Sequence, residues 1–411
     1  MRPLFFFLLL FLNTVCMAQK KKIKRPGVYV KEVSRLPSSI AEVETAIPAF
    51  IGYTEKATKQ NAGDLFFVPQ RINSMTEFEN YFGFSANSGD FVLYASMKIY
   101  FANGGGNCYV ISVGNYNEPI QRDAFFKGLT AAGQQDELTL LVFPDAAYLP
   151  GNDLYEVQKA ALRQAEDLGD RFCIFDLKFA DNKTRHDKVV QEFRDNIGMQ
   201  NLKFGAAYTP YLVPTSNSTA AVPPSGAIAG VYCSVDKSRG VWKAPANVSL
   251  SMVNSLTYAI GESEQAALNV DAVAGKSINS VRVFSGKGIM VWGARTLAGN
   301  DNEWRYVPVR RFFTTAEESI TKSAQPFVFE PNDANTWVRI KAMIENYLTL
   351  KWRAGALQGS KPEHAFFLKT GLGETMTQSD INNKKILIEY GMAAVRPAEF
   401  IVTRIVLKMA N

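Results

Sequence analysis

Between residues 138 and 212, short apolar runs alternate with amphipathic segments, and this pattern constrains the fold more than any other feature of the chain. Strands of a parallel sheet are buried on both faces, so they can be uniformly apolar, and helical crossovers join them. The apolar runs cover residues 138–143, 172–177 and 204–212, and the helix-like segments between them cover residues 154–168 and 183–197. The sequence therefore predicts a mixed α/β fold with a βαβ core.

Shorter elements surround this core. Strand-like segments are expected at residues 28–33, 45–53, 108–113, 281–284, 288–292, 385–390 and 399–407, and helices at residues 75–82, 92–101, 226–235, 312–323 and 335–353. A chain of 411 residues exceeds one average domain. We therefore expect several folded units with ample hydrophobic core.

The charge balance argues against a nucleic-acid partner. Lys and Arg total 45 against 39 Asp and Glu, and the net charge of +6 is a weak bias for a chain of this length. The basic run at residues 20–25 contains no aromatic side chain that could stack on a base. We interpret this run as a solvated lead-in.

Potential metal ligands are scarce in the sequence. Two histidines and four cysteines, with no C-x-x-C spacing, do not supply the four grouped ligands of a structural zinc site. We therefore expect no metal and no other cofactor. Scattered cysteines of this kind are typical of reduced thiols in a cytosolic protein.

The first residues indicate a different compartment. Arg2 precedes an apolar run at residues 4–12, and small residues precede Gln19, which is the pattern of a secretory signal peptide. The run has nine residues, whereas a membrane-spanning helix needs about 20, so it is not a membrane anchor. The alternative is that translation starts at Met17. Composition alone favours the signal peptide.

Motifs that could carry catalysis are incomplete. Residues 274–277 read Ala-Gly-Lys-Ser, but a phosphate loop also needs glycine at position 270, which is Val270. The three glycines at residues 104–106 precede a strand, which indicates a tight turn and not a dinucleotide site. His186 and His364 lie in polar stretches and are expected at the surface, so neither is placed as the base of a catalytic triad. We predict no catalytic residue.

Several motifs, in order along the chain, resemble one family. They lie at residues 26–30, 45–52, 103–110, 223–232, 239–247, 291–297, 304–311, 329–333 and 397–401. On these motifs, from about residue 25 to the C-terminus, the chain resembles contractile tail sheath proteins. It is most similar to the short sheaths of phage-like extracellular injection systems and R-type tailocins.

The resemblance implies a multi-domain sheath fold whose βαβ core has subtilisin-like topology without the catalytic triad. It also implies a non-enzymatic subunit that polymerises helically around an inner tube and contracts to drive the tube through a target envelope. The implied partners are further copies of the chain, the inner tube protein, and baseplate and terminator or cap proteins. Neither nucleic acid nor direct membrane insertion is implied.

The implied setting is assembly in the bacterial cytoplasm, followed by release as part of an extracellular phage tail-like particle. In that setting residues 1–16 are not expected to act as a signal peptide, which reverses the preference from composition. Two alternatives stay open. One is the tail sheath of a phage or prophage, and the other, from a different class, is a secreted α/β hydrolase-like enzyme that depends on His186 or His364.

Both ends of the chain are strand-like, and the resemblance implies that they are arms that pair with neighbouring subunits by β-augmentation. The candidate arm residues are Gly27, Val28, Tyr29, Val30, Val33, Phe400, Ile401, Val402, Ile405 and Leu407. The family also places a tube-attachment element in the C-terminal portion, which is commonly basic. The candidate tube contacts are Lys341, Lys351, Arg353 and Lys361.

The expected domain organisation follows from these assignments. It consists of a leader and basic lead-in at residues 1–24, an N-terminal β-arm at 25–40, a first part of the sheath core or outer domain at 41–135, an α/β sheath domain at 136–300, an inner domain with a tube-facing helix at 301–396, and a C-terminal β-arm at 397–411.

Overall fold

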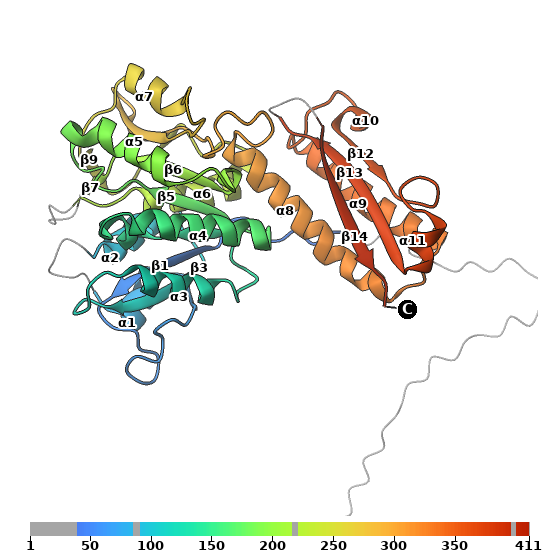
Figure 1. Ribbon diagram of the computed structural model, residues 1–411, viewed down its shortest axis with the longest axis horizontal. Coiled ribbons are helices and arrows are strands. Elements are labelled where there is room, and N and C mark those ends of the chain that lie inside the picture. Colours follow the sequence, from blue (N-terminus) through green and yellow to red (C-terminus); the bar gives the residue numbers. More distant parts are fainter. Residues whose placement is uncertain (1–38, 85–90, 216–220, 396–399, 411) are drawn as a thin grey trace, which may run out of the picture. The chain divides into compact units, whose positions relative to one another are not determined.

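The computed structural model describes residues 39–84, 91–215, 221–395 and 400–410 (Figure 1). The candidate arm residues Gly27, Val28, Tyr29, Val30 and Val33 lie outside the described residues. Two bodies of secondary structure follow one another along the described chain. We call them the sheet unit, up to residue 306, and the C-terminal unit, from residue 307 onward.

The sheet unit is built on a nine-stranded mixed sheet with the order β2-β3-β1-β4-β5-β6-β10-β11-β8. Six of these strands, from β3 to β10 in that order, run parallel, and β2, β11 and β8 are antiparallel to their neighbours. The strands are β1 (Pro48–Thr54), β2 (Gln70–Ile72), β3 (Cys108–Asn115), β4 (Leu140–Val142), β5 (Phe172–Asp176), β6 (Gly205–Thr209), β8 (Val248–Ser249), β10 (Asn279–Phe284) and β11 (Gly288–Trp292). A separate pair joins β7 (Leu212–Pro214) to β9 (Val253–Leu256).

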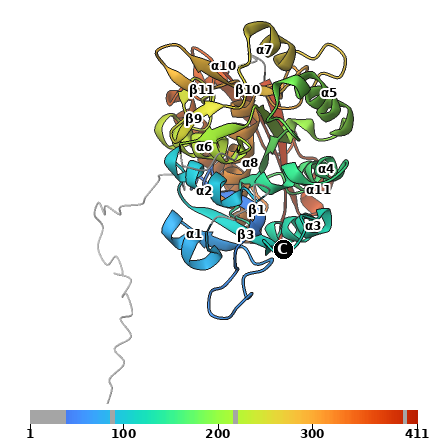
Figure 2. The same cartoon turned by 90° about the vertical axis from the view of Figure 1, so that its left-hand side faces the viewer.

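Helices cover both faces of this sheet, which explains why its central strands are uniformly apolar. Figure 2 shows α1 and α2 on one side of β1 and β3, and α3 and α4 on the other. One core lies under α3, α4 and α5, and a second lies under α1, α2 and α6. The helices of the sheet unit are α1 (Met75–Phe82), α2 (Leu93–Ala102), α3 (Arg122–Ala132), α4 (Asp153–Leu168), α5 (His186–Asn196), α6 (Ser225–Arg239) and α7 (Glu262–Asn269), with 3-10 turns at Pro144–Tyr148, Lys183–Arg185 and Leu202–Phe204.

The C-terminal unit packs two long helices against a three-stranded antiparallel sheet of order β12-β13-β14 and encloses a third core (Figure 1). Its elements are α8 (Val307–Ala324), a 3-10 turn at Gln325–Phe329, α9 (Ala334–Arg353), α10 (Pro362–Ala365), β12 (Phe366–Lys369), α11 (Gln378–Asn382), β13 (Lys385–Ala393) and β14 (Phe400–Lys408). Ile340, Ile344 and Leu348 lie on the buried face of α9, as their helical spacing predicts.

Most predicted elements are present, and two differences have clear causes. The apolar run at residues 204–212 is not one strand, because Pro210 has no N–H for a ladder, and β6 therefore ends at Thr209 before β7 begins at Leu212. The helix expected from residue 312 begins at Val307. Pro308 occupies its first turn, where the absent N–H costs nothing.

Candidate functional site

In most open α/β sheets, ligands bind at the carboxyl edge of the parallel strands. In this chain two buried acids lie at that edge. Asp145 follows β4 and is fully buried. Its Oδ1 accepts hydrogen bonds from the backbone N–H groups of Val92 and Leu93, at 2.7 and 2.9 Å, and its Oδ2 accepts one from Tyr53 at 2.7 Å. The carboxyl group therefore caps the N-terminus of α2, whose helix dipole favours negative charge.

Asp176 has the same role one strand along. It ends β5, is buried, and accepts hydrogen bonds from Ser225 at the start of α6, from the backbone N–H at 2.9 Å and from Oγ at 2.5 Å. A serine at a helix N-terminus beside an acid resembles the catalytic nucleophile of a hydrolase. Here the hydroxyl donates to the carboxyl group, and both groups serve to hold α6 on the sheet.

The pKa values of both acids are shifted in the same direction. Burial raises the pKa of Asp145 to about 7, against the opposing effect of the three backbone N–H groups that bind it. Burial likewise raises the pKa of Asp176 to about 7, against the two hydrogen bonds from Ser225.

The prediction for His186 was wrong, because this side chain is buried and not at the surface. His186 opens α5 and lies on the same face as Val189, Val190 and Phe193, a stripe that the flanking polar residues obscured in the sequence. Its Nδ1 lies 2.9 Å from the hydroxyl of Tyr258, and burial lowers its pKa. The contacts of His186 in the described chain do not include Ser225 or Asp176.

His364 is exposed, as predicted, and its Nδ1 lies 3.2 Å from Ser360 Oγ. The glycines at residues 104–106 form the turn between α2 and β3, and Gly104 has a φ of +96° that favours glycine. This agrees with the tight turn that the sequence predicts.

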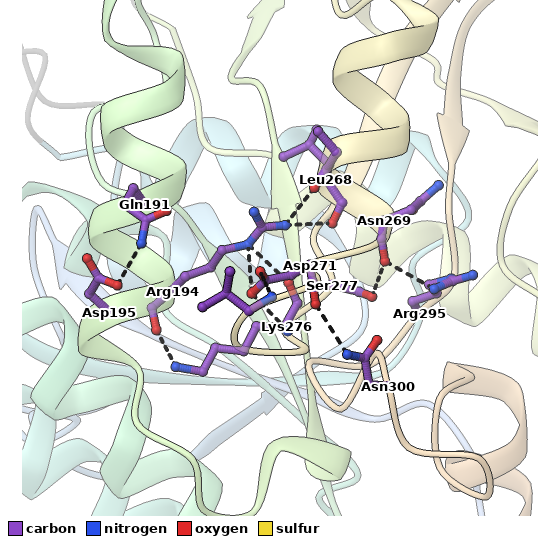
Figure 3. Close-up of polar contacts among 12 residues, drawn as sticks. Gln191, Arg194, Asp195, Leu268, Asn269, Asp271, Lys276, Ser277, Arg295 and Asn300 are labelled. Carbon is purple, nitrogen blue, oxygen red and sulfur yellow. Dashed lines mark hydrogen bonds and ion pairs between the residues drawn. The ribbon is translucent and has the colours of Figure 1, made fainter.

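The Ala-Gly-Lys-Ser motif belongs to a packed polar cluster (Figure 3). Lys276 is buried, and its Nζ donates to the backbone carbonyl of Arg194 near the end of α5. The Arg194 guanidinium in turn donates to the backbone carbonyls of Ala267 and Leu268 at the end of α7, at 2.8 and 3.1 Å, and lies 3.5 Å from Asp271. These contacts satisfy the last carbonyls of α7, and the lysine that a phosphate would need is already bound elsewhere.

The candidate residues of the C-terminal arm lie in β14, at one edge of the three-stranded sheet. β14 pairs with β13 along its whole length, from Phe400 opposite Ala393 to Lys408 opposite Lys385. Ile401 and Leu407 are buried in the third core, Ile405 is half-buried and Val402 is exposed. Within the described residues no strand pairs with the other edge of β14.

The basic candidates on and after α9 fall into two groups. Arg353 and Lys361 are exposed, and Lys341 is half-buried. Lys351 is only 9% exposed, and its Nζ forms an ion pair with Glu42, so the structure does not present it to a partner as predicted. The helical spacing did not reveal this, because Glu42 approaches from a distant part of the sequence.

A buried ion pair joins α8 to the sheet unit, and the sequence analysis did not identify it. Arg311 in α8 makes two contacts with Asp236 in α6, at 3.0 and 2.5 Å, and both side chains are 4% exposed. The Arg311 guanidinium also donates to the carbonyl of Thr45 at 2.8 Å and lies over the ring of Tyr232. The sequence feature that could have indicated this pair is the two adjacent arginines in the apolar first turns of a helix. An arginine buried there requires an anion as its partner.

Two features, a membrane-spanning helix and a metal-ligating cluster, are absent from the described residues. No helix there is both long enough and apolar enough to cross a membrane. Within the same residues, no group of three or more His, Cys, Asp and Glu side chains is arranged to hold a metal ion.

Comparison with known proteins identifies consistent relatives. The family described as "Phage tail sheath C-terminal domain" matches residues 299–408. The helical sheath of the anti-feeding prophage in its contracted state is 35% identical, with a TM-score of 0.71, over 93% of this chain and 99% of that chain. The sheath complex of the extracellular contractile injection system PVC, also contracted, is 34% identical with a TM-score of 0.69, over 93% and 97%.

A curated relative matches a shorter stretch. The tail sheath protein of Vibrio phage KVP40 is 29% identical over 128 residues, which are 31% of this chain and 19% of that protein. The chain therefore aligns with about a fifth of the length of this curated relative.

Asp145 should make the stability of the chain depend on pH. Its folded-state pKa of about 7 exceeds the ordinary value of 3.8, so between these values the folded chain binds a proton that the unfolded chain does not. Acidification in this window should therefore stabilise the folded state by up to about 1.4 kcal/mol per pH unit. Urea unfolding of the unassembled chain at about pH 7 and about pH 5 should show this gain, and Asp145→Asn should show a smaller gain, to which Asp176 still contributes.

Asp64 provides a matched control. It is exposed, and hydrogen bonds from backbone N–H groups lower its pKa, so Asp64→Asn should not reduce the gain on acidification. An equal gain in the wild type and in Asp145→Asn would show that Asp145 is ionised throughout this range.

Proposed function

The chain belongs to the contractile tail sheath family, and from this premise we propose that it is the structural subunit of a contractile sheath. In this proposal the subunit polymerises helically around an inner tube, and contraction of the polymer drives the tube through a target envelope. The observation that carries the proposal is the 35% identity to the anti-feeding prophage sheath over 99% of that chain, with a TM-score of 0.71.

We propose that the role is non-enzymatic. Asp145 binds backbone N–H groups at the start of α2, and Asp176 binds Ser225 at the start of α6. The competing hydrolase hypothesis needs a histidine beside a nucleophile in an enclosed site. His186 contacts Tyr258, and His364 lies beside Ser360, but both residues of that second pair are exposed.

We propose that the terminal arms hold the polymer together. The edge of β14 that no described strand pairs with offers backbone donors and acceptors along nine residues, to which an extended segment of a neighbouring subunit can add as a strand. Main-chain pairing of this kind tolerates rotation of the folded bodies that it joins. Contraction is then a shift from a metastable arrangement to a more stable one, driven by the interfaces and without nucleotide.

The tube-facing set that we propose consists of Lys341, Arg353 and Lys361. These side chains lie on and just after α9, and none has an ion-pair partner among the contacts of the described chain. Exposed cations at the rim of an interface give register and can be released without a large penalty. Lys351 is left out of this set because its charge is paired with Glu42.

The particle that we propose is an extracellular contractile injection system or a tailocin, with a phage or prophage tail as the alternative. Support comes from the two injection-system sheaths among the relatives. A chain of the anti-feeding prophage baseplate is similarly related, with 35% identity, which supports association with a baseplate. Assembly in the bacterial cytoplasm, and contacts with a tube protein and a terminator or cap protein, belong to the same proposal.

Removing residues 17–33 should abolish polymerisation and leave the described units folded. The three described cores are formed by residues that follow this segment, so we expect both units to fold without it, whereas its loss removes the strand that the proposal assigns to a neighbour. Sedimentation should find the full chain in large polymers and the shortened chain as a monomer with unchanged circular dichroism. Polymerisation of the shortened chain at the wild-type concentration would contradict the arm proposal.

Reversing the charge of Arg353 and Lys361 should weaken assembly on the inner tube more than assembly of empty sheath. Rim charges set the rate and register of association, so the effect should decrease at high salt. Co-sedimentation with the tube measures the first process, and sedimentation without the tube measures the second. Lys188→Glu, at an exposed position of α5, is the control. Equal loss in both assays would remove the tube-contact assignment.

A further inference from the structure

Residues 39–47 form an extended segment, which we call the strap, that leads into β1 without being part of a helix or a strand. The strap touches both units. Ile40 packs against the core of the C-terminal unit, and Ala46 packs against a core of the sheet unit. Ile47 pairs with Thr139, through a hydrogen bond of 2.7 Å from its N–H to Thr139 Oγ1. In Figure 1 the strap is the dark blue trace that reaches β1 from the side of α8.

Three polar contacts fix the strap to the C-terminal unit. The Glu42 carboxylate forms an ion pair with Lys351 in α9. The N–H of Val43 donates to Ser319 Oγ in α8 at 3.1 Å, and the carbonyl of Thr45 accepts from Arg311, also in α8, at 2.8 Å. The strap therefore meets α8 and α9 before it reaches the sheet.

The ion pair holds a buried cation in place. Lys351 is buried, and its Nζ lies 5.4 Å from the ring centre of Trp242 and 5.3 Å from that of Tyr347. Aromatic faces stabilise a cation only partly, and a buried ammonium group needs an anion. In the described chain that anion is Glu42, whose side chain is 37% exposed.

The strap borders a cavity, which Trp242 and Lys351 also line. Glu42 and the five residues that follow it line this open cavity of about 620 Å³ together with the glycine turn at residues 104–106. With a cavity on one side, the position of the strap depends on its few contacts with α8 and α9. Loss of one strong contact should therefore loosen the strap without unpacking a core.

We propose that the Glu42–Lys351 ion pair anchors the root of the N-terminal arm to the C-terminal unit. In this arrangement a pull on the arm from a neighbouring subunit is transmitted to α8 and α9 before it reaches β1. Both residues act as positioning residues, since they hold the strap in place. The inference rests on the proposed sheath function, because it assumes an arm that is pulled.

Hydrogen exchange of the full-length, unassembled chain tests the anchor directly. Glu42→Gln keeps the size of the side chain and removes its charge, and Lys351→Met keeps the aliphatic stem beside the aromatic rings. Each change should speed exchange of the Val43 amide, which donates to Ser319 Oγ, about tenfold, as expected for the loss of a charged hydrogen bond. Lys351→Arg should retain slow exchange, and the double variant should exchange no faster than Lys351→Met.

Arg339→Met is the matched control, because it removes an exposed ion pair with Glu330 from the same helix. It should leave exchange of the Val43 amide unchanged. If Lys351→Met lowers the melting temperature of the whole chain, Glu42→Gln decides the question, since its side chain is not in a core. Unchanged exchange of the Val43 amide in Glu42→Gln would overturn the anchor.

A second measurement separates the anchor from the sheath function. Polymers of Glu42→Gln should dissociate at a lower urea concentration than polymers of the wild type and of Arg339→Met. Equal urea midpoints would overturn the role of the ion pair in bearing load, while the sheath function would stand. Failure of the wild type to polymerise would instead contradict the sheath function, and a load-bearing role for the ion pair would be rejected with it.

Discussion

A buried ion pair between Arg311 and Asp236 joins the two units of the subunit, beside the apolar contacts that Val241 makes with the third core. Arg311 lies in α8, whose neighbouring side chains Phe312 and Phe313 are part of the third core, and Asp236 lies in α6 of the sheet unit. Removing one member of a buried pair leaves an uncompensated charge, which typically costs about 3–5 kcal/mol. The pair therefore holds the C-terminal unit on the sheet unit through a contact that is costly to break. The strap, which also contacts Arg311 through Thr45, adds a second connection at the same place.

The sheet unit has its own internal connections, and they use the residue types that an enzyme of this fold class would use for catalysis. Asp145 follows β4, and Asp176 ends β5, the neighbouring strand. The two acids bind the first turns of α2 and α6. Those two helices lie so close together that a Cβ added at Gly230 would lie 2.5 Å from the carbonyl oxygen of Tyr100. Buried acids and close helix packing both favour a stiff body over an open cleft, which suits a subunit that transmits force.

The sequence was sufficient for the parts of the structure that depend on local pattern. The uniformly apolar runs at residues 138–143 and 172–177 indicated the parallel strands, and the helix expected at residues 154–168 matches α4. Contacts between distant segments could not be derived in this way. The helical spacing indicated that Lys351 is exposed, because its partner Glu42 lies 309 residues away in the sequence. His186 was expected at the surface because polar residues precede it and the buried stripe of α5 begins with His186 itself. The residues proposed for the arms and the tube contact concern other molecules, about which one chain's pattern carries little information.

The proposed sheath requires that the chain form a polymer through its strand edges. Electron microscopy of the purified full chain at high concentration, with helical reconstruction at a resolution that shows main-chain pairing, tests this requirement. Hollow helical tubes are expected, in which a strand from a neighbouring subunit lies along the edge of β14 that no described strand pairs with. A chain that stays monomeric at every concentration, or a polymer in which that edge of β14 is unpaired, would contradict the proposed sheath.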